Sequence, residues 1–168
     1  DSEATDGNQY INKGYRHYDM TLDGNVIDVF ILHMDAGDTN ASWSRESQWR
    51  QLAEAVNWTD PARPKLIIGD TNSRWTREDI MANFMNRLRS DIIPSDVWVE
   101  LWRDGVYPTT LMDHLVDQSV PRNYTNYEVV DKIIYINPIT VNSLQLIPKS
   151  FRIEQGYTYG KIDGTNDS

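Results

Sequence analysis

The first regular pattern in the chain is an alternation of apolar and polar residues that predicts a β-hairpin. Between residues 15 and 22, the side chains of Tyr18, Met20 and Leu22 fall on one face of a strand. Residues 23–25, Asp-Gly-Asn, predict a tight turn, and the apolar run 26–32 predicts a second strand. We expect this second strand to be buried on both faces near its end. Residues 1–14 are polar and are expected to form a loop.

A helix and a short buried strand are predicted next. Residues 42–57 carry apolar side chains at helical spacing, and two prolines beyond residue 60 prevent the helix from continuing. Residues 65–69, Lys-Leu-Ile-Ile-Gly, form an apolar run between breakers, which is typical of a buried strand. The order strand, helix, strand therefore predicts an α/β fold.

The second half of the chain predicts a further helix and further strands. Residues 76–79 resemble a capping box, and the helix that follows carries on one face Ile80, Met81, Phe84, Met85 and Leu88. The stretch 94–126 is mixed, with a helical turn expected at 97–102. Residues 128–136 predict a strong strand, and further β segments are expected at 141–147 and 150–153.

Composition excludes several classes of protein. The length of 168 residues favours a single domain, and the net charge of −9 opposes sequence-independent binding to long nucleic acids. The absence of cysteine excludes disulfides, thiolate nucleophiles and zinc–thiolate sites. No apolar stretch approaches the roughly 18 residues of a membrane span. The cellular location is left open, with a secreted or periplasmic one favoured.

Polar residues at the ends of two predicted strands are the first candidates for chemistry. His33 follows the apolar run of the hairpin, where the alternative is a core histidine with satisfied hydrogen bonds. Asp70 and Asn72 follow the strand 65–69, and a carboxylate beside a carboxamide can position a hard cation, water and a phosphate oxygen. On spacing alone, an Asx-turn that ends the strand is an equal alternative.

Asp131 is the third candidate, because it is a carboxylate within an otherwise apolar strand. An unpaired buried carboxylate is costly, so we expect Asp131 to be buried with a dedicated partner. The partner is either Lys132 or a backbone amide on structural grounds, or a histidine or metal on functional grounds. Alternation along the strand places Lys132 on the opposite face, which weakens the structural alternative.

Taken together, these motifs resemble the endonuclease/exonuclease/phosphatase family. Four features occur in the family's order: a histidine after a strand, the helix Arg45-Glu-Ser-Gln48-Trp-Arg-Gln51-Leu52, the motif Gly69-Asp-Thr-Asn72, and Val130-Asp-Lys-Ile-Ile-Tyr135. Each motif is weak by itself, and the order of the four makes the resemblance specific. It covers nearly the whole chain, 1–168, as one partial domain.

The resemblance implies a fold, a cofactor and a set of roles. The implied fold is α/β, a two-layer β-sandwich flanked by helices that is deoxyribonuclease-like and incomplete at both ends. The cofactor is Mg²⁺, or Mn²⁺ in its place, and an activated water attacks a phosphate ester. His33 resembles the histidine that contacts the scissile phosphate, and Asp70 the residue that orients or deprotonates the water and contributes to metal binding. Asn72 resembles the residue that positions water and phosphate, and Asp131 the carboxylate that orients a second histidine.

This sequence also departs from the family's pattern. The family has an upstream Asn, an upstream Glu that holds the metal, and a downstream Ser-Asp-His segment, none of which is found here. We therefore expect a fragment whose main metal ligands lie outside it, in the remainder of the same polypeptide or in a complementing chain. The fragment alone is expected to be inactive.

The sequence leaves two functions open. The first is a metal-dependent hydrolase of phosphodiesters or phosphomonoesters, and the second is a noncatalytic binding or scaffold domain of the same fold. Because of the negative charge, a small phosphorylated substrate is favoured over long nucleic acid. Arg74 is the candidate for binding it; other basic candidates, each with a solvated surface position as the alternative, are Arg77, Arg103 and Lys132.

Overall fold

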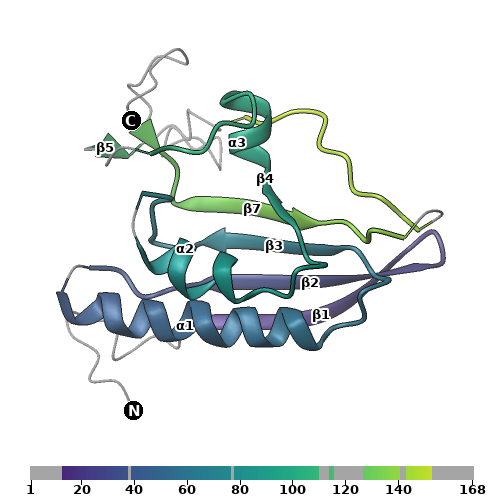
Figure 1. Ribbon diagram of the computed structural model, residues 1–168, viewed down its shortest axis with the longest axis horizontal. Helices are drawn as coiled ribbons and strands as arrows, with labels where there is room; N and C mark the ends of the chain where they lie inside the picture. The colour runs from purple at the N-terminus through teal and green to yellow at the C-terminus, as the bar shows by residue number, and fades with distance from the viewer. Residues whose placement is uncertain are drawn as a thin grey trace, which may run out of the picture.

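The computed structural model describes residues 13–37, 39–76, 78–109, 114–115, 127–140 and 143–152. Within these ranges the chain forms a mixed α/β structure built on a five-stranded sheet (Figure 1). None of its helices is both long and apolar enough to cross a membrane. The α/β fold class expected from the sequence is confirmed.

The sheet has the strand order β1-β2-β3-β7-β4. Strands β1 (Gly14–Leu22) and β2 (Asn25–His33) form the predicted antiparallel hairpin. β3 (Lys65–Asp70) runs parallel to β2, and β7 (Asp131–Ile136) runs antiparallel to β3. β4 (Pro94–Asp96) pairs with the other side of β7. Because β2 and β3 are parallel neighbours, their carboxyl ends meet at one edge of the sheet.

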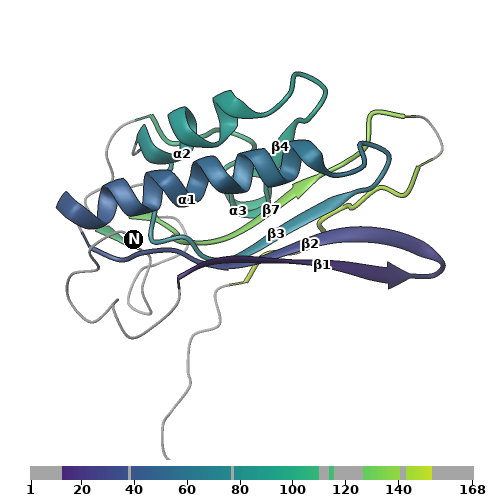
Figure 2. The ribbon, with the colours of Figure 1, turned by 90° about the horizontal axis from the view of Figure 1, so that it is seen from below.

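The helices lie together over one face of this sheet. Figure 2 shows α1 (Thr39–Trp58) and α2 (Glu78–Asn83) side by side above the strands. The buried apolar face of α1 is the one that helical spacing predicted, and it comprises Trp49, Leu52, Ala53 and Val56. These side chains share a core with Phe30 and Leu32 of β2. Burial of these large side chains is the main favourable contribution to holding α1 on the sheet.

A short helix, α3 (Val97–Trp102), continues directly from β4. Its N-cap is Asp96, whose Oδ1 accepts hydrogen bonds from the backbone N–H groups of Trp98 and Val99. The predicted helical turn at 97–102 is therefore confirmed, whereas strand β4 was not predicted. Three residues are too few for a periodic signal, so β4 depends on its pairing with β7.

Several other sequence predictions are corrected. β2 is buried on both faces in its middle, at residues 27–30, and not near its end, where Ile31 is exposed. The second helix ends at Asn83, and a 3₁₀ turn (Met85–Arg87) follows it. Within the helix, Met81 is exposed instead of facing the core. The predicted strand 128–136 is divided into β6 (Tyr127–Glu128) and β7, and β6 pairs with β5 (His114–Leu115) in a parallel two-stranded sheet.

The prediction of further strands near the C-terminus is also wrong where it can be tested. Residues 143–152 form no strand in the part of the structure that is described. The loop predicted for residues 1–14 lies mostly outside the described residues, and Gly14 already belongs to β1.

Candidate functional site

Three of the residues singled out in the sequence form a row across adjacent strands. In the parallel pair of β2 and β3, His33 is opposite Asp70. In the antiparallel pair of β3 and β7, Asp70 is opposite Asp131. Residues opposite one another across neighbouring strands project from the same face of a sheet. The fold therefore brings one imidazole and two carboxylates together from segments that are up to 98 positions apart in the chain.

His33 lies between an acidic and a basic group. Its Nε2 atom is 3.7 Å from Oδ2 of Asp70 and 2.5 Å from Nζ of Lys13. The imidazole is half exposed, so the alternative of a core histidine does not apply.

Asp131 differs from the expectation of a buried carboxylate. It occupies an exposed position of β7, and Lys132 is the buried residue, in keeping with the alternation along the strand. Partial loss of solvent raises the pKa of Asp131, and the nearby charge of Asp70 raises it further, while Lys132 and His33 act in the opposite direction. In the described chain no side chain donates a hydrogen bond to Asp131. A side-chain partner is thus not found there, whereas a hydrogen bond with its own backbone acts to lower the pKa of Asp131.

Asp70 and Asn72 form the Asx-turn that the sequence left as an alternative. The backbone N–H of Asn72 donates to Oδ1 of Asp70 at 2.9 Å, and Asn72 has a φ of +48°, which Asn tolerates better than most residues. The side-chain amide of Asn72 donates to the carbonyl of Met34 at 2.9 Å. The turn leaves Oδ2 of Asp70 on the side of His33. Asp70 can therefore form the Asx-turn with Oδ1 and still offer Oδ2 to a cation or a water molecule.

Gly69 explains why the motif begins with glycine. Its φ is +139°, and a Cβ atom built there would lie 2.0 Å from the carbonyl oxygen of Leu32. Only a residue without a side chain allows β3 to approach β2 this closely. The short separation fixes the position of Asp70 relative to His33.

The residues on either side of Asn72 are held by buried hydrogen bonds. Thr71 Oγ1 donates to the carbonyl of Val130 at 2.7 Å, and the backbone N–H of Thr71 donates to the same carbonyl at 3.1 Å. Ser73 Oγ accepts from the indole N–H of Trp49 at 3.1 Å. The loop is therefore tied both to the segment before β7 and to α1, which restricts the motion of Asp70 and Asn72.

The loop after His33 is held in a similar way by α1. Arg45, although fully buried, donates to the backbone carbonyls of Asp35 and Gly37 at 3.0 and 3.1 Å. Gln48 and Ser44 both hydrogen-bond to the Asp35 side chain, and the Gln48 carbonyl oxygen accepts from the Asp35 backbone N–H. The polar residues of the helix motif thus have a positioning role, since they fix the chain immediately beyond His33.

Arg74 and Lys132 lie around another buried carboxylate, Glu128. Burial raises the pKa of Glu128, and the charges of Lys132 and Arg74 oppose that rise. Lys132 is buried, donates to the carbonyl of Val129 at 2.9 Å and lies over the ring of Trp75, so it is not the solvated surface charge that was one expectation. No described contact joins Arg74 to His33. Its role in binding substrate stays a prediction.

Sequence reasoning gave no weight to Glu128, Lys13 and Arg16. Glu128 opens the predicted strand and carries no motif, so only its burial distinguishes it. Lys13 and Arg16 stand in a polar segment before and within the hairpin, where basic residues are ordinarily solvated. Only the pairing of β1 with β2 brings them toward His33.

A second cluster of possible metal ligands lies toward the other end of the hairpin. Oxygen and nitrogen atoms of His17, Asp19 and Asp28 lie within 4.8 Å of one another. Cationic side chains already surround these carboxylates: Arg63 lies 3.5 Å from Asp19, and Lys65 lies 3.8 Å from the buried Asp28. The arrangement fits a charge-paired structural network better than a site for an added cation.

Comparisons with solved structures identify the fold. A humanized D. rerio TDP2 with 14 mutations is 16% identical over 76% of this chain, with a TM-score of 0.50. Sphingomyelinase C from Streptomyces griseocarneus is 16% identical over 81% of the chain, also with a TM-score of 0.50. The protein named SmcL is 13% identical over 80% of the chain, with a TM-score of 0.52. The fold is that of the deoxyribonuclease I-like proteins.

The comparisons show the fold and no closer relationship. The chain spans 46% of the length of each of these three proteins. No family model and no curated protein sequence matches the chain. The fold expected from the four motifs is confirmed, while the assignment of site residues stays a prediction.

Proposed function

We propose that the chain is part of a metal-dependent phosphoric ester hydrolase that activates water at the row of His33, Asp70 and Asp131. The observation that carries the proposal is the register, which brings these three side chains to one face at one edge of the sheet. His33 and Asp70 end the parallel strands β2 and β3, and Asp131 begins the antiparallel strand β7. Polar groups at that edge are held by a rigid sheet and are accessible to a ligand. The deoxyribonuclease I-like fold supports the same chemistry at the level of architecture.

Each side chain at this site has a separate role in the proposed reaction. Oδ2 of Asp70, on the side of His33, orients the attacking water and accepts its proton. His33 contacts the scissile phosphate, and Asn72 holds the chain that positions water and phosphate. Asp131 supplies a second carboxylate, or orients a second histidine as the family resemblance implies. Whether the bond is a diester or a monoester is left to experiment.

The donor set fits a hard divalent cation. Asp70 and Asp131 are opposite one another, and their mutual repulsion contributes to the raised pKa of Asp131. Mg²⁺, or Mn²⁺ in its place, would bind carboxylate oxygens and relieve that repulsion. When bound, the ion neutralises negative charge on phosphoryl oxygens. Asp70 is the proposed ligand from this chain, with further ligands supplied from outside it.

Turnover of simple esters tests this proposal. Bis(p-nitrophenyl) phosphate and p-nitrophenyl phosphate are offered to the full-length protein in Mg²⁺ and in EDTA, beside the 168-residue chain. We expect metal-dependent release of nitrophenol by the full-length protein from at least one ester, and a loss of about 10²-fold or more in Asp70→Asn. The matched control is Asp104→Asn, which removes the same charge from an exposed turn and is expected to keep full activity.

Two outcomes would contradict the proposal. If Asp70→Asn hydrolyses both esters as fast as the control, Asp70 does not act on the water. If a folded full-length protein hydrolyses neither ester in Mg²⁺, the noncatalytic binding domain of the same fold becomes the better description.

A further inference from the structure

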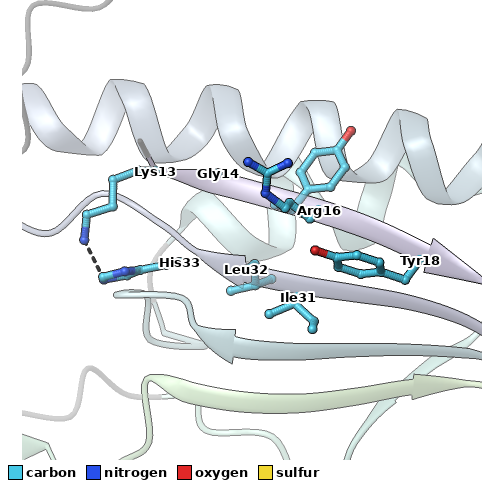
Figure 3. Close-up of a pocket in the computed structure, with 8 residues that line it drawn as sticks. Lys13, Gly14, Arg16, Tyr18, Ile31, Leu32 and His33 are labelled. Carbon is cyan, nitrogen blue, oxygen red and sulfur yellow. Dashed lines mark hydrogen bonds between the residues drawn. The ribbon is translucent and has the colours of Figure 1, made fainter. Parts of the chain in front are cut away.

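Asp70 and Asp131 are opposite one another at the last position of the ladder between β3 and β7. β3 ends at Asp70 and β7 begins at Asp131, so the pairing of the two strands stops at this point. His33 likewise lies at the end of β2, beside Lys13 (Figure 3). Like charges that are directly opposite each other on neighbouring strands repel. The two carboxylates therefore lie where the ladder separates most easily and where their own charges act to separate it.

Thr71 continues the pairing by one residue beyond the ladder. Its backbone N–H donates to the carbonyl of Val130 at 3.1 Å, and its hydroxyl donates to the same oxygen at 2.7 Å. Thr71 directly follows Asp70, and Val130 directly precedes Asp131. Because Thr71 is fully buried, water does not compete for its hydroxyl. One side chain thus joins the residue after the first carboxylate to the residue before the second.

The hydroxyl of Thr71 is itself held by neighbouring groups. It accepts a hydrogen bond from the backbone N–H of Ser73 at 3.2 Å, and the Ser73 hydroxyl donates to the Thr71 carbonyl at 3.1 Å. Trp49 of α1 in turn donates its indole N–H to the Ser73 hydroxyl. All three side chains are completely buried. A buried network of this kind keeps a side chain in one rotamer, so the hydroxyl of Thr71 has a fixed direction toward Val130.

We propose that Thr71 is a positioning residue whose hydroxyl holds Asp70 and Asp131 at the separation that a divalent cation requires. This inference rests on the proposed function, because Asp70 is the proposed ligand of that cation. In this role Thr71 touches neither the cation nor the substrate, since its hydroxyl is bonded to the Val130 carbonyl. Replacing a residue that orients metal ligands typically weakens metal binding by about 10- to 100-fold.

Binding of Mn²⁺ tests the inference without requiring turnover. Mn²⁺ is titrated into the full-length protein, and electron paramagnetic resonance measures the Mn²⁺ that remains free in solution. Asp70→Asn identifies the relevant site, because it should remove the binding that depends on Asp70. At that site, Thr71→Val loses the hydroxyl, keeps the shape of the side chain and should raise the dissociation constant about tenfold or more. Thr71→Ser keeps the hydroxyl and should stay within about twofold of the unchanged protein.

Thr59→Val is the matched control. The Thr59 hydroxyl also donates to a backbone carbonyl at 2.7 Å, that of Val56, but it lies just beyond the end of α1. The substitution removes the same kind of hydrogen bond far from the site, so the Mn²⁺ dissociation constant should change by less than about twofold. Urea unfolding shows whether each variant is folded. If Thr71→Val does not fold, Thr71→Cys supplies a weaker donor of similar size and should raise the dissociation constant about threefold or more.

The results separate this inference from the proposed function. If Thr71→Val weakens Mn²⁺ binding no more than Thr59→Val or Thr71→Ser does, the Thr71 hydroxyl does not position the site, even in a protein that hydrolyses esters. If Asp70→Asn leaves Mn²⁺ binding unchanged, the inference also fails, since Asp70 then holds no cation. Conversely, weaker binding in Thr71→Val alone would support the positioning role in a protein that hydrolyses no ester, and only the hydrolase would be rejected.

Discussion

At the scale of single residues, Gly69 sets the distance between the two strands that carry His33 and Asp70. A methyl group at Gly69 would overlap the Leu32 carbonyl, and the backbone there has a positive φ. The matched comparison is Gly14, which has nearly the same φ, +137°, and where a Cβ atom would meet nothing within 4 Å. The two glycines therefore separate the cost of backbone strain from the cost of overlap.

We predict that Gly69→Ala destabilises the protein much more than Gly14→Ala does. Gly14→Ala should cost about 1–2 kcal/mol through strain. Gly69→Ala should cost about 1–3 kcal/mol more, because β2 and β3 must move apart. Urea unfolding followed by circular dichroism gives both free energies of unfolding. Equal losses in the two variants would show that β3 does not need this close approach.

At the scale of secondary-structure elements, the sequence pattern predicts the helices and strands that are determined by their own residues and need no distant pairing partner. The hairpin, α1 and β3 follow from alternation, helical spacing and turn residues, and His33, Asp70 and Asn72 were found because they end such elements. Elements that depend on a distant partner were missed or misplaced. β4 forms by pairing with β7, and Lys13 and Arg16 approach His33 only through the pairing of β1 with β2. Asp131 and Lys132 were assigned to opposite faces correctly, but the sequence could not tell which face the helices cover.

Helix α3 offers a test at this scale, because the buried side chain of Asp96 makes two separate contributions to its stability. Asp96 caps the helix through Oδ1, and its Oδ2 accepts from the indole N–H of Trp75 at 2.8 Å. We predict that Asp96→Ala costs about 2–4 kcal/mol: about 1 for the cap and the rest for a buried indole N–H without an acceptor.

A double-mutant cycle separates the two contributions. Trp75→Phe removes the indole N–H, so Asp96→Ala should cost about 1–3 kcal/mol less in that background. Thermal or urea unfolding of the four proteins gives the coupling. Additive losses would mean that the hydrogen bond between Asp96 and Trp75 contributes nothing measurable.

At the scale of the whole molecule, the sheet has two unlike faces. The helices cover one face, as Figure 2 shows, whereas the other carries exposed apolar side chains on three strands. This exposed apolar face consists of Tyr18, Met20, Leu22, Ile31 and Ile133. A contiguous apolar surface of this kind favours association, while the net charge of −9 opposes it.

Because the apolar face favours association and the net charge opposes it, self-association should depend on the salt concentration. At low ionic strength, repulsion between negatively charged copies should keep the 168-residue chain dispersed. Above about 0.1 M salt the screening length falls to about 10 Å, so the apolar attraction should prevail and the chain should self-associate. Sedimentation velocity at increasing salt concentration measures the self-association of the chain.

Two variants test which surface is responsible. Ile31→Lys places a charge within the exposed apolar face and should reduce association. Trp58→Lys should not reduce it, because Trp58, although 89% exposed, lies at the end of α1 and outside that face. A chain that stays monomeric at every salt concentration, or that responds equally to both substitutions, would show that this face does not drive association.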